Sequence, residues 1–198
     1  MFKARVQKLK DKINQAKLDG VFISSVSNIE YLTGYSNFSK DEREAYIFIG
    51  KNFGYIITDG RYKEAIRKQI SHLTLFERGQ KFQTEDLFKK LKTRIKILGI
   101  EEDNLTVEEH KILKKHFNNI KHFAVGHLRS IKTEDEIKKI KNACRIGDLA
   151  FDYIIKHVKV GITEKQIAEE LENYIRGKGA ALSFPPIIAF GKNSSIPH

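Results

Sequence analysis

Apolar residues recur at helical spacing over the first twenty positions of the chain. The positions are Phe2, Val6, Leu9, Ile13, Ala16 and Leu18. This spacing predicts an amphipathic helix that ends at Asp19-Gly20. A short continuous apolar run at residues 21–24 follows and is typical of a buried strand. The chain is therefore predicted to open with one helix and one buried strand.

Strand and helix signals alternate from there to residue 125. Apolar runs at 45–50 and 54–58 flank a short turn and predict a β-hairpin. Further strands are predicted at residues 72–77, 95–102 and 120–125. Asn28 and Asp59 are predicted to cap helices, and two further helices are predicted to start near Thr84 and at Thr106. Alternating strands and helices indicate an α/β sheet domain over residues 1–127.

The pattern changes after Gly126. Thr133 and Glu136 stand at capping-box spacing. The apolar residues that follow trace one face of a long helix: Ile137, Ile140, Ala143, Cys144, Gly147, Ala150 and Phe151. A second helix is predicted after Thr163, and a strand is predicted from Phe184 to Phe190. Two helices and one strand are too few to enclose a core, so residues 128–198 are predicted to be the truncated start of a second domain.

Composition and charge fit a globular protein. The 198 residues carry 36 Lys+Arg against 25 Asp+Glu, a formal charge of +11. The excess is spread over both parts, mostly as lysines mixed with glutamates on helical patterns, so we expect a solvated surface and no nucleic-acid partner. The single cysteine, Cys144, excludes an internal disulfide and is predicted to lie in the core. With no signal-peptide pattern and no apolar run of membrane length, the protein is predicted to be cytoplasmic without a membrane partner.

Motifs for common chemistries are absent from the sequence. It has no phosphate-binding P-loop, no G-x-G-x-x-G opening a helix, no H-E-x-x-H and no paired cysteines for zinc. The seven histidines show no ligand spacing matched to nearby carboxylates. We expect no metal site in this chain, and the residues by themselves indicate no complete catalytic site.

Ordered motifs along nearly the whole chain nevertheless carry a family resemblance. In the first part they are Arg5 to Gly20, Asn28 to Gly34 and Asp59 to Tyr62. In the second part they are the segment from Arg129, Gly161 to Glu164, Gly179-Ala180, Ser183-Phe184, Ile187 to Ala189, Gly191, Asn193 and Pro197-His198. The sequence resembles the creatinase/prolidase/aminopeptidase P group of metallopeptidases. The resemblance implies an α/β N-terminal domain followed by the first part of a pita-bread α+β catalytic domain.

The resemblance also implies an activity and its cofactors. Members of this group cleave the peptide bond before proline, using water activated by two divalent metal ions (Mn, Co or Zn). The family's metal ligands are two Asp, one His and two Glu, and all lie downstream of the motif that ends at His198. This chain is therefore expected to hold neither metal ion and to be inactive by itself. The complete enzyme is expected to act on proline-containing peptides as a homodimer.

Two residues of the second part carry family roles by resemblance. His198 matches the catalytic histidine that faces the substrate, where an imidazole with a pKa of ~6.5 can donate to the substrate or stabilise a tetrahedral intermediate. Phe184 matches an aromatic residue of the substrate pocket, although ordinary core packing explains it equally well. Pro186 and Phe190 depart from the acidic and small residues that relatives often carry.

The motif residues of the first part have simpler interpretations. Asn28, Tyr31, Gly34 and Asp59 are expected to be structural, and Arg61 and Tyr62 are candidates for a subunit interface. The alternative to the enzyme is a non-enzymatic protein of the same fold that binds protein or nucleic acid. Another reaction on this fold, such as creatine hydrolysis or removal of an initiator methionine, is a further alternative. The ligands encoded downstream would discriminate between these alternatives.

Overall fold

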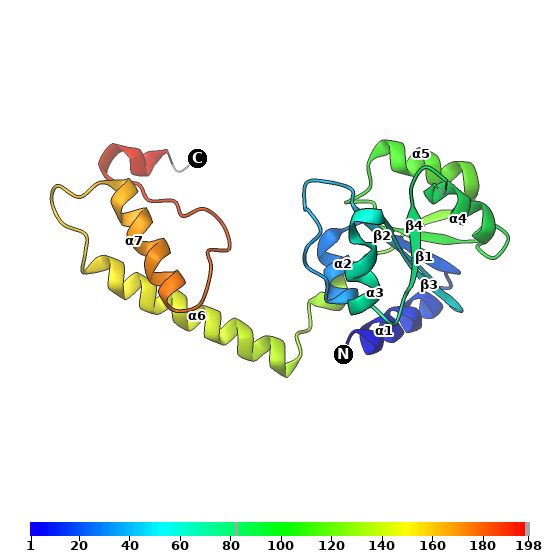
Figure 1. Cartoon of the computed structure of the whole chain (residues 1–198), viewed down its shortest axis with the longest axis horizontal. Coiled ribbons are helices and arrows are strands. Elements are labelled where there is room, and N and C mark those ends of the chain that lie inside the picture. The colour runs from blue at the N-terminus through cyan, green and yellow to red at the C-terminus, as the bar shows by residue number, and fades with distance from the viewer. Residues whose placement is uncertain (82, 197–198) are drawn as a thin grey trace. The chain divides into compact units, whose positions relative to one another are not determined.

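The computed structural model describes residues 1–81 and 83–196. The chain divides into two compact units, Met1–Ile131 and a second that begins at Lys132 (Figure 1). The division falls four residues beyond the boundary expected from the sequence. Leu128 belongs to the first unit because its side chain is buried in that unit's core and its carbonyl accepts a hydrogen bond from the Tyr31 hydroxyl at 3.1 Å.

A six-stranded mixed sheet forms the centre of the first unit. Its strands are β1 (Gly20–Ile23), β2 (Ala45–Gly50), β3 (Phe53–Asp59), β4 (Thr74–Arg78), β5 (Leu98–Ile100) and β6 (Ile120–His122). The strand order is β4-β3-β2-β1-β5-β6, and β2 runs antiparallel to both of its neighbours while the other pairs are parallel. The β2–β3 pair confirms the predicted hairpin, and the sheet with its helices confirms the α/β class.

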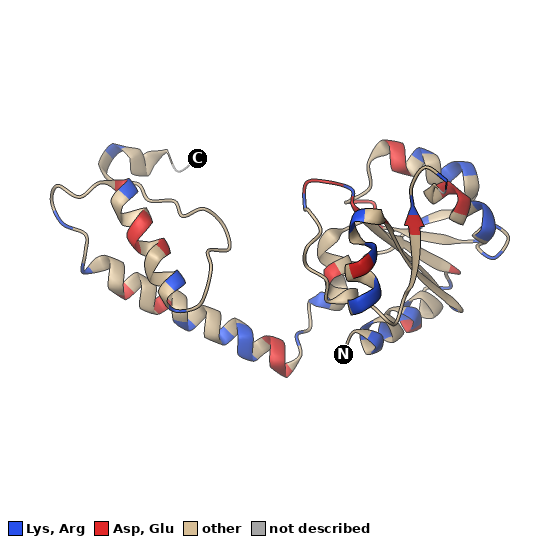
Figure 2. Cartoon of the chain, in the orientation of Figure 1, with Lys and Arg blue, Asp and Glu red and all other residues tan. Residues whose placement is uncertain are grey.

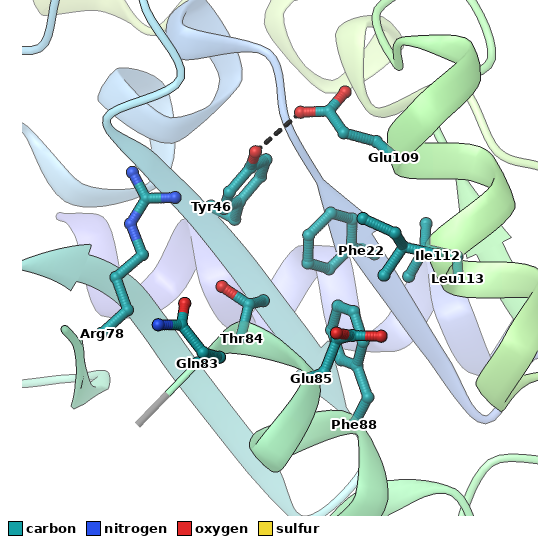
Figure 3. Close-up of a pocket in the computed structure, with 10 residues that line it drawn as sticks. All are labelled: Phe22, Tyr46, Arg78, Gln83, Thr84, Glu85, Phe88, Glu109, Ile112 and Leu113. Carbon is teal, nitrogen blue, oxygen red and sulfur yellow. Dashed lines mark hydrogen bonds between the residues drawn. The ribbon is translucent and has the colours of Figure 1, made fainter. Parts of the chain in front are cut away.

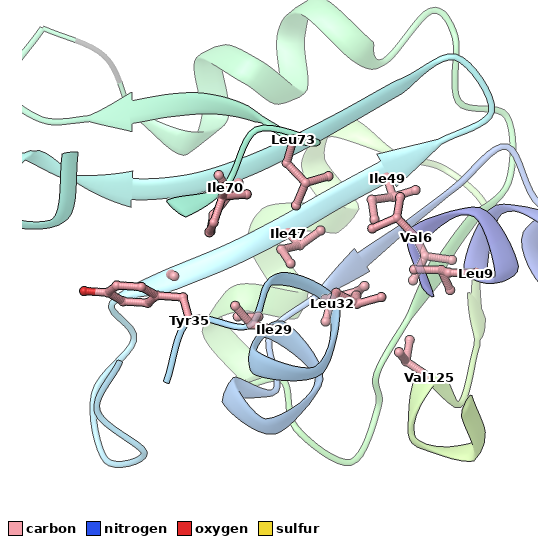
Figure 4. Close-up of a cluster of buried hydrophobic side chains, with 14 of the residues drawn as sticks. Val6, Leu9, Ile29, Leu32, Tyr35, Ile47, Ile49, Ile70, Leu73 and Val125 are labelled. Carbon is pink, nitrogen blue, oxygen red and sulfur yellow. The ribbon is translucent and has the colours of Figure 1, made fainter. Parts of the chain in front are cut away.

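Helices cover both faces of this sheet. The first unit contains α1 (Phe2–Gln15), α2 (Val26–Thr33), α3 (Lys63–Gln69), α4 (Thr84–Leu91), α5 (Val107–His116) and the 3-10 turns η1 (Gly60–Tyr62) and η2 (Val125–Arg129). Because side chains alternate along a strand, Val21 and Ile23 of β1 lie on one face and Phe22 on the other. Helices α1, α2 and α3 bury their apolar residues on the first face (Figure 4), and α4 and α5 on the second.

Capping residues explain where these helices begin and end. Thr106 and Glu109 form the predicted capping box of α5, with the Thr106 hydroxyl accepting from the Glu109 amide at 3.1 Å. The expectation that Asn28 caps a helix is wrong: Ser25 is the cap, and Asn28 lies inside α2. Gly34 ends α2 in the left-handed conformation (φ 77°), and a Cβ there would lie 2.4 Å from the Phe2 ring. Only glycine fits that position.

The second unit is built from two helices and irregular chain. Helix α6 spans Glu134–Ile155, α7 spans Glu164–Gly177, and a 3-10 turn, η3, spans Gly191–Ser195. Thr133 and Thr163 cap the two helices, each in a capping box. The strand predicted from Phe184 to Phe190 is wrong, because the described residues after Lys132 contain no strand with which it could pair.

Most of the apolar face predicted for α6 is exposed. Ile140 and Phe151 are 48% and 66% exposed, and Cys144 is exposed as well, so its predicted place in the core is wrong. Buried hydrophobic residues of this unit are Ala150, Ile154 and Ile167, at the contact between α6 and α7. One neighbouring helix covers only part of the apolar face, which leaves the rest in solvent. None of the helices in the described part of the chain combines the length and apolarity of a membrane span.

Candidate functional site

Glu164, the first residue of α7, binds the segment at residues 190–193 through hydrogen bonds. The Glu164 carboxylate accepts the backbone N–H of Phe190 at 2.7 Å and the side-chain amide of Asn193 at 3.0 Å. These donors, the Phe190 N–H first, hold the pKa of Glu164 below its usual value, so the carboxylate is charged at neutral pH. Glu164 is thus a clamp between a helix and a loop 26 residues away.

The two residues expected to contact substrate lie in or beyond this segment. Phe184 lies in the irregular chain between α7 and η3 and is 69% exposed, so it packs in no core of the described residues. His198 lies outside the described residues. The catalytic and substrate-binding roles of these two residues therefore stay predictions.

A metal pair does not fit the residues that the structure describes. Holding a divalent ion takes several His, Cys, Asp or Glu side chains directed at one point. Within residues 1–81 and 83–196, no three such side chains come together in that way. These residues alone therefore support no step of a metal-dependent reaction, and the expected absence of metal from this chain stays a prediction.

In the first unit, a buried carboxylate joins the family motif at Asn28 to the strand β5. Glu101 is only 2% exposed, and its Oε2 accepts the backbone N–H groups of Ser24 and Ser25, each at 2.8 Å. Its Oε1 accepts from the Asn28 side-chain amide, and Asn28 Oδ1 accepts from Arg129 at 3.0 Å. Burial raises the pKa of Glu101, and the three donors oppose that rise. The network fixes the start of α2 beside the end of β5 and lines a polar cavity of about 290 Å³.

A second buried carboxylate organises the motif at Asp59 to Tyr62. Glu44 is 6% exposed and accepts the Tyr62 hydroxyl and, at 2.6 Å, the Ser39 N–H. The Tyr62 hydroxyl first, then the Ser39 N–H and Arg61, lower the pKa of Glu44, while Glu44 raises the pKa of Tyr62 to about 12. Asp59 accepts the Arg61 N–H at 3.0 Å, which is the predicted cap. The polar side chains of the motif therefore have hydrogen-bond partners within this chain.

Sequence reasoning missed all three carboxylates as organising residues. Glu44 meets Tyr62 across 18 positions, Glu101 meets Asn28 across 73 and Glu164 meets Phe190 across 26. Local spacing carries no signal for such pairs. The one available signal is a charged residue directly beside an apolar run, as Glu44 stands before β2 and Glu101 after β5.

Comparison with protein-family models assigns both parts of the chain. Residues 5–131 match the creatinase/prolidase N-terminal domain, which covers more than half of the chain. The chain belongs to the creatinase/prolidase family. Residues 138–198 match the metallopeptidase family M24, so the family's N-terminal and peptidase models follow one another in this order.

Known relatives of this family match across both units. An uncharacterised peptidase of Bacillus subtilis is 32% identical over 98% of this chain and 55% of its own length. The solved structure of an Xaa-Pro dipeptidase from Bacillus anthracis is 28% identical, with a TM-score of 0.84, over 100% of this chain and 56% of that one. A prolidase from Pyrococcus horikoshii is 27% identical, with a TM-score of 0.81, over 98% and 55%. The chain therefore spans about half the length of each of these three relatives.

Proposed function

We propose that the complete protein is a cytoplasmic Xaa-Pro metallopeptidase, of the prolidase or aminopeptidase P type. The supporting observation is the match of all of this chain to the structure of an Xaa-Pro dipeptidase. In this proposal, residues 1–127 and the few residues after them form the N-terminal domain, and the remainder begins the catalytic domain. The substrate is a peptide with proline after the scissile bond, and the enzyme works as a homodimer.

Within this proposal, His198 and Phe184 act on the substrate from this half of the protein. The His198 imidazole donates a hydrogen bond to the substrate or to the oxyanion that develops on the attacked carbonyl. Phe184 lines the pocket that receives an apolar part of the peptide. Divalent metal ions supply the activated water, and their ligands are proposed to lie outside the described residues.

The test is peptide hydrolysis by the full-length protein loaded with Mn, Co or Zn. Cleavage of an Xaa-Pro dipeptide, together with no cleavage of the matching Xaa-Ala dipeptide, would support the proposal. A tripeptide with proline at its second position separates an aminopeptidase from a dipeptidase. Hydrolysis without preference for proline would contradict the proposal.

A substitution of His198 tests its role in the same protein. His198→Ala should lower kcat by about 100–1000-fold while leaving the metal content unchanged, because one donor to developing charge is lost. His122→Ala, which removes an exposed histidine from the edge strand β6, is the matched control and should keep full activity. Loss of metal in His198→Ala would make His198 a ligand, and full activity would make it a bystander.

A further inference from the structure

A cavity of about 390 Å³ opens in the first unit between α4, α5 and the sheet (Figure 3). Its lining comes from β1, β2, β4, the N-terminal half of α4 with its cap Gln83, and α5: Phe22, Tyr46, Arg78, Gln83, Thr84, Glu85, Phe88, Glu109, Ile112 and Leu113. Every lining residue belongs to the first unit, so the cavity exists independently of the second unit and of the peptidase activity proposed above. Its volume lies in the range of small-molecule sites.

The floor of this cavity is apolar and belongs to the core. Phe22 and Phe88 are each 2% exposed, and their rings meet edge to face with centroids 5.5 Å apart. Leu113 is 1% exposed, and Ile112 of the same helix continues the apolar wall (Figure 3). Such a floor favours binding of a ligand with an apolar part, because that part is removed from water, and it does not favour a wholly polar ligand.

The two carboxylates at the rim already have partners. Glu109 accepts the Tyr46 hydroxyl at 2.7 Å and the Thr106 N–H at 2.7 Å, and it pairs with Arg43 at 3.2 Å. Glu85 pairs with the His116 ring at 3.1 Å. The Glu109 charge is therefore compensated by Arg43, whereas Glu85 is held by a histidine ring that carries a charge only when protonated.

Arg78 is different. Its guanidinium lies over the Tyr46 ring, 5.5 Å from the centroid, and one nitrogen donates to the Arg43 carbonyl. Among the residues that the structure describes, no carboxylate lies within ion-pair distance of it. A guanidinium presents five N–H donors in a fork that matches a carboxylate, and the bond to Arg43 engages only part of that fork. Asp59 faces Arg78 across the β3–β4 pair but lies beyond ion-pair distance, so the rim offers a guanidinium with remaining N–H donors above an apolar floor.

We propose that this cavity binds a small carboxylic acid with an apolar body. The carboxylate lies against the Arg78 guanidinium, and the body packs on Phe22, Phe88 and Ile112. Arg78 ends β4 and Phe88 lies in α4, so a ligand that contacts both also connects the edge of the sheet to the helix that follows it.

The experiment titrates the isotope-labelled 198-residue chain with 3-phenylpropanoate and follows amide shifts by NMR. Its uncharged and cationic analogues, 3-phenylpropanamide and 3-phenylpropylamine, have nearly the same apolar body. The acid should shift amides of α4, α5 and β4 and bind at least about tenfold tighter than the amide, since a charge-assisted hydrogen bond is worth that factor or more. Equal affinity for acid and amide, tighter binding of the amine, or no shifts up to about 10 mM would overturn the proposal.

Variants then assign the charge and the cavity. Arg78→Gln should remove the preference for the acid, and Arg78→Lys should restore part of it. Arg67→Gln makes the same charge change on α3, which covers the other face, and should leave binding unchanged. Ile112→Trp should fill the cavity and weaken acid and amide alike, provided that the spectrum stays folded. Unchanged binding in both Arg78→Gln and Ile112→Trp would place the ligand elsewhere and overturn the proposal.

Discussion

The two units of this chain use the same helix signals but differ in what covers the helices. In the first unit, α1 and α2 bury Leu9, Ile13 and Ile29 completely against a sheet whose own residues alternate between two cores. In the second, α6 and α7 have only each other and leave Phe151 and Phe184 mostly exposed. Amphipathic periodicity therefore specifies a helix, whereas the stability of that helix depends on the surface it meets.

Charge distribution differs between the units in the same way. In the first unit, Glu44 and Glu101 are buried and each accepts three or more hydrogen bonds or ion pairs from residues elsewhere in the chain. In the second unit, most of the described charged residues lie along α6 and α7 (Figure 2), and Glu164 accepts hydrogen bonds from a loop 26 residues away. Buried charges fix a unique arrangement only where a core already surrounds them.

Core truncation should expose this difference most strongly. Ile47→Ala removes a fully buried side chain from β2 and should lower the free energy of unfolding by about 2–5 kcal/mol. Ile140→Ala makes the same chemical change on α6, where the side chain is 48% exposed, and should cost less than about 0.5 kcal/mol. Urea titration of each variant measures both values. Similar losses would mean that α6 is packed as tightly as the sheet.

Removing the charge of the buried Glu44 carboxylate, which accepts the Tyr62 hydroxyl, should change the free energy of unfolding by a smaller amount. Glu44→Gln should cost about 1–2 kcal/mol at neutral pH, because one charged acceptor of the Tyr62 hydroxyl and the Ser39 N–H is lost. Because the folded-state pKa of Glu44 is lowered, its contribution is complete above the unfolded pKa of ~4.3 and is lost as pH falls through the folded value. Unfolding at several pH values should show wild type and variant converging in acid.

The control for that pH dependence is Glu64→Gln on α3. Its carboxylate is 89% exposed, so this variant should follow the wild type at every pH. If Glu44→Gln kept a constant deficit down to acidic pH, the charge on Glu44 would not be the source of its contribution.

The smallest effect is expected at the Glu164 clamp. Glu164→Ala should leave unfolding of the first unit unchanged and accelerate amide exchange at Phe190, whose N–H loses its acceptor. Glu169→Ala on the same helix removes an exposed carboxylate that pairs with Lys165, and it should not alter exchange at Phe190. Unchanged exchange at Phe190 in Glu164→Ala would show that this hydrogen bond does not hold the loop.

What the sequence could predict follows the range of the interactions involved. Helices capped at Thr106, Thr133 and Thr163 and the hairpin of β2 and β3 are set by residues within a few positions, and their prediction is confirmed. Features set by distant partners were not predictable in this way. The Phe184 to Phe190 strand had no neighbour to pair with, and Cys144 had no surface to cover it.

For the candidate site, too, the sequence indicated single residues but not their distant partners. Asn28 was singled out by its motif, but its buried partner Glu101 lies 73 positions away and only the folded chain brings them together. The motif residues Phe184 and His198 come from family resemblance, and their chemistry needs groups that the described residues do not supply.

Amide hydrogen exchange on the intact 198-residue chain tests the contrast between the units most directly. The amides of β1 and β2 should exchange only through global unfolding, because both strands are buried and flanked on each side. Those of α6 and α7 should exchange far faster, through opening of a helix pair whose apolar faces are largely in solvent. Equal protection of α6 and β2 would contradict the account, since it would require a complete core in the second unit.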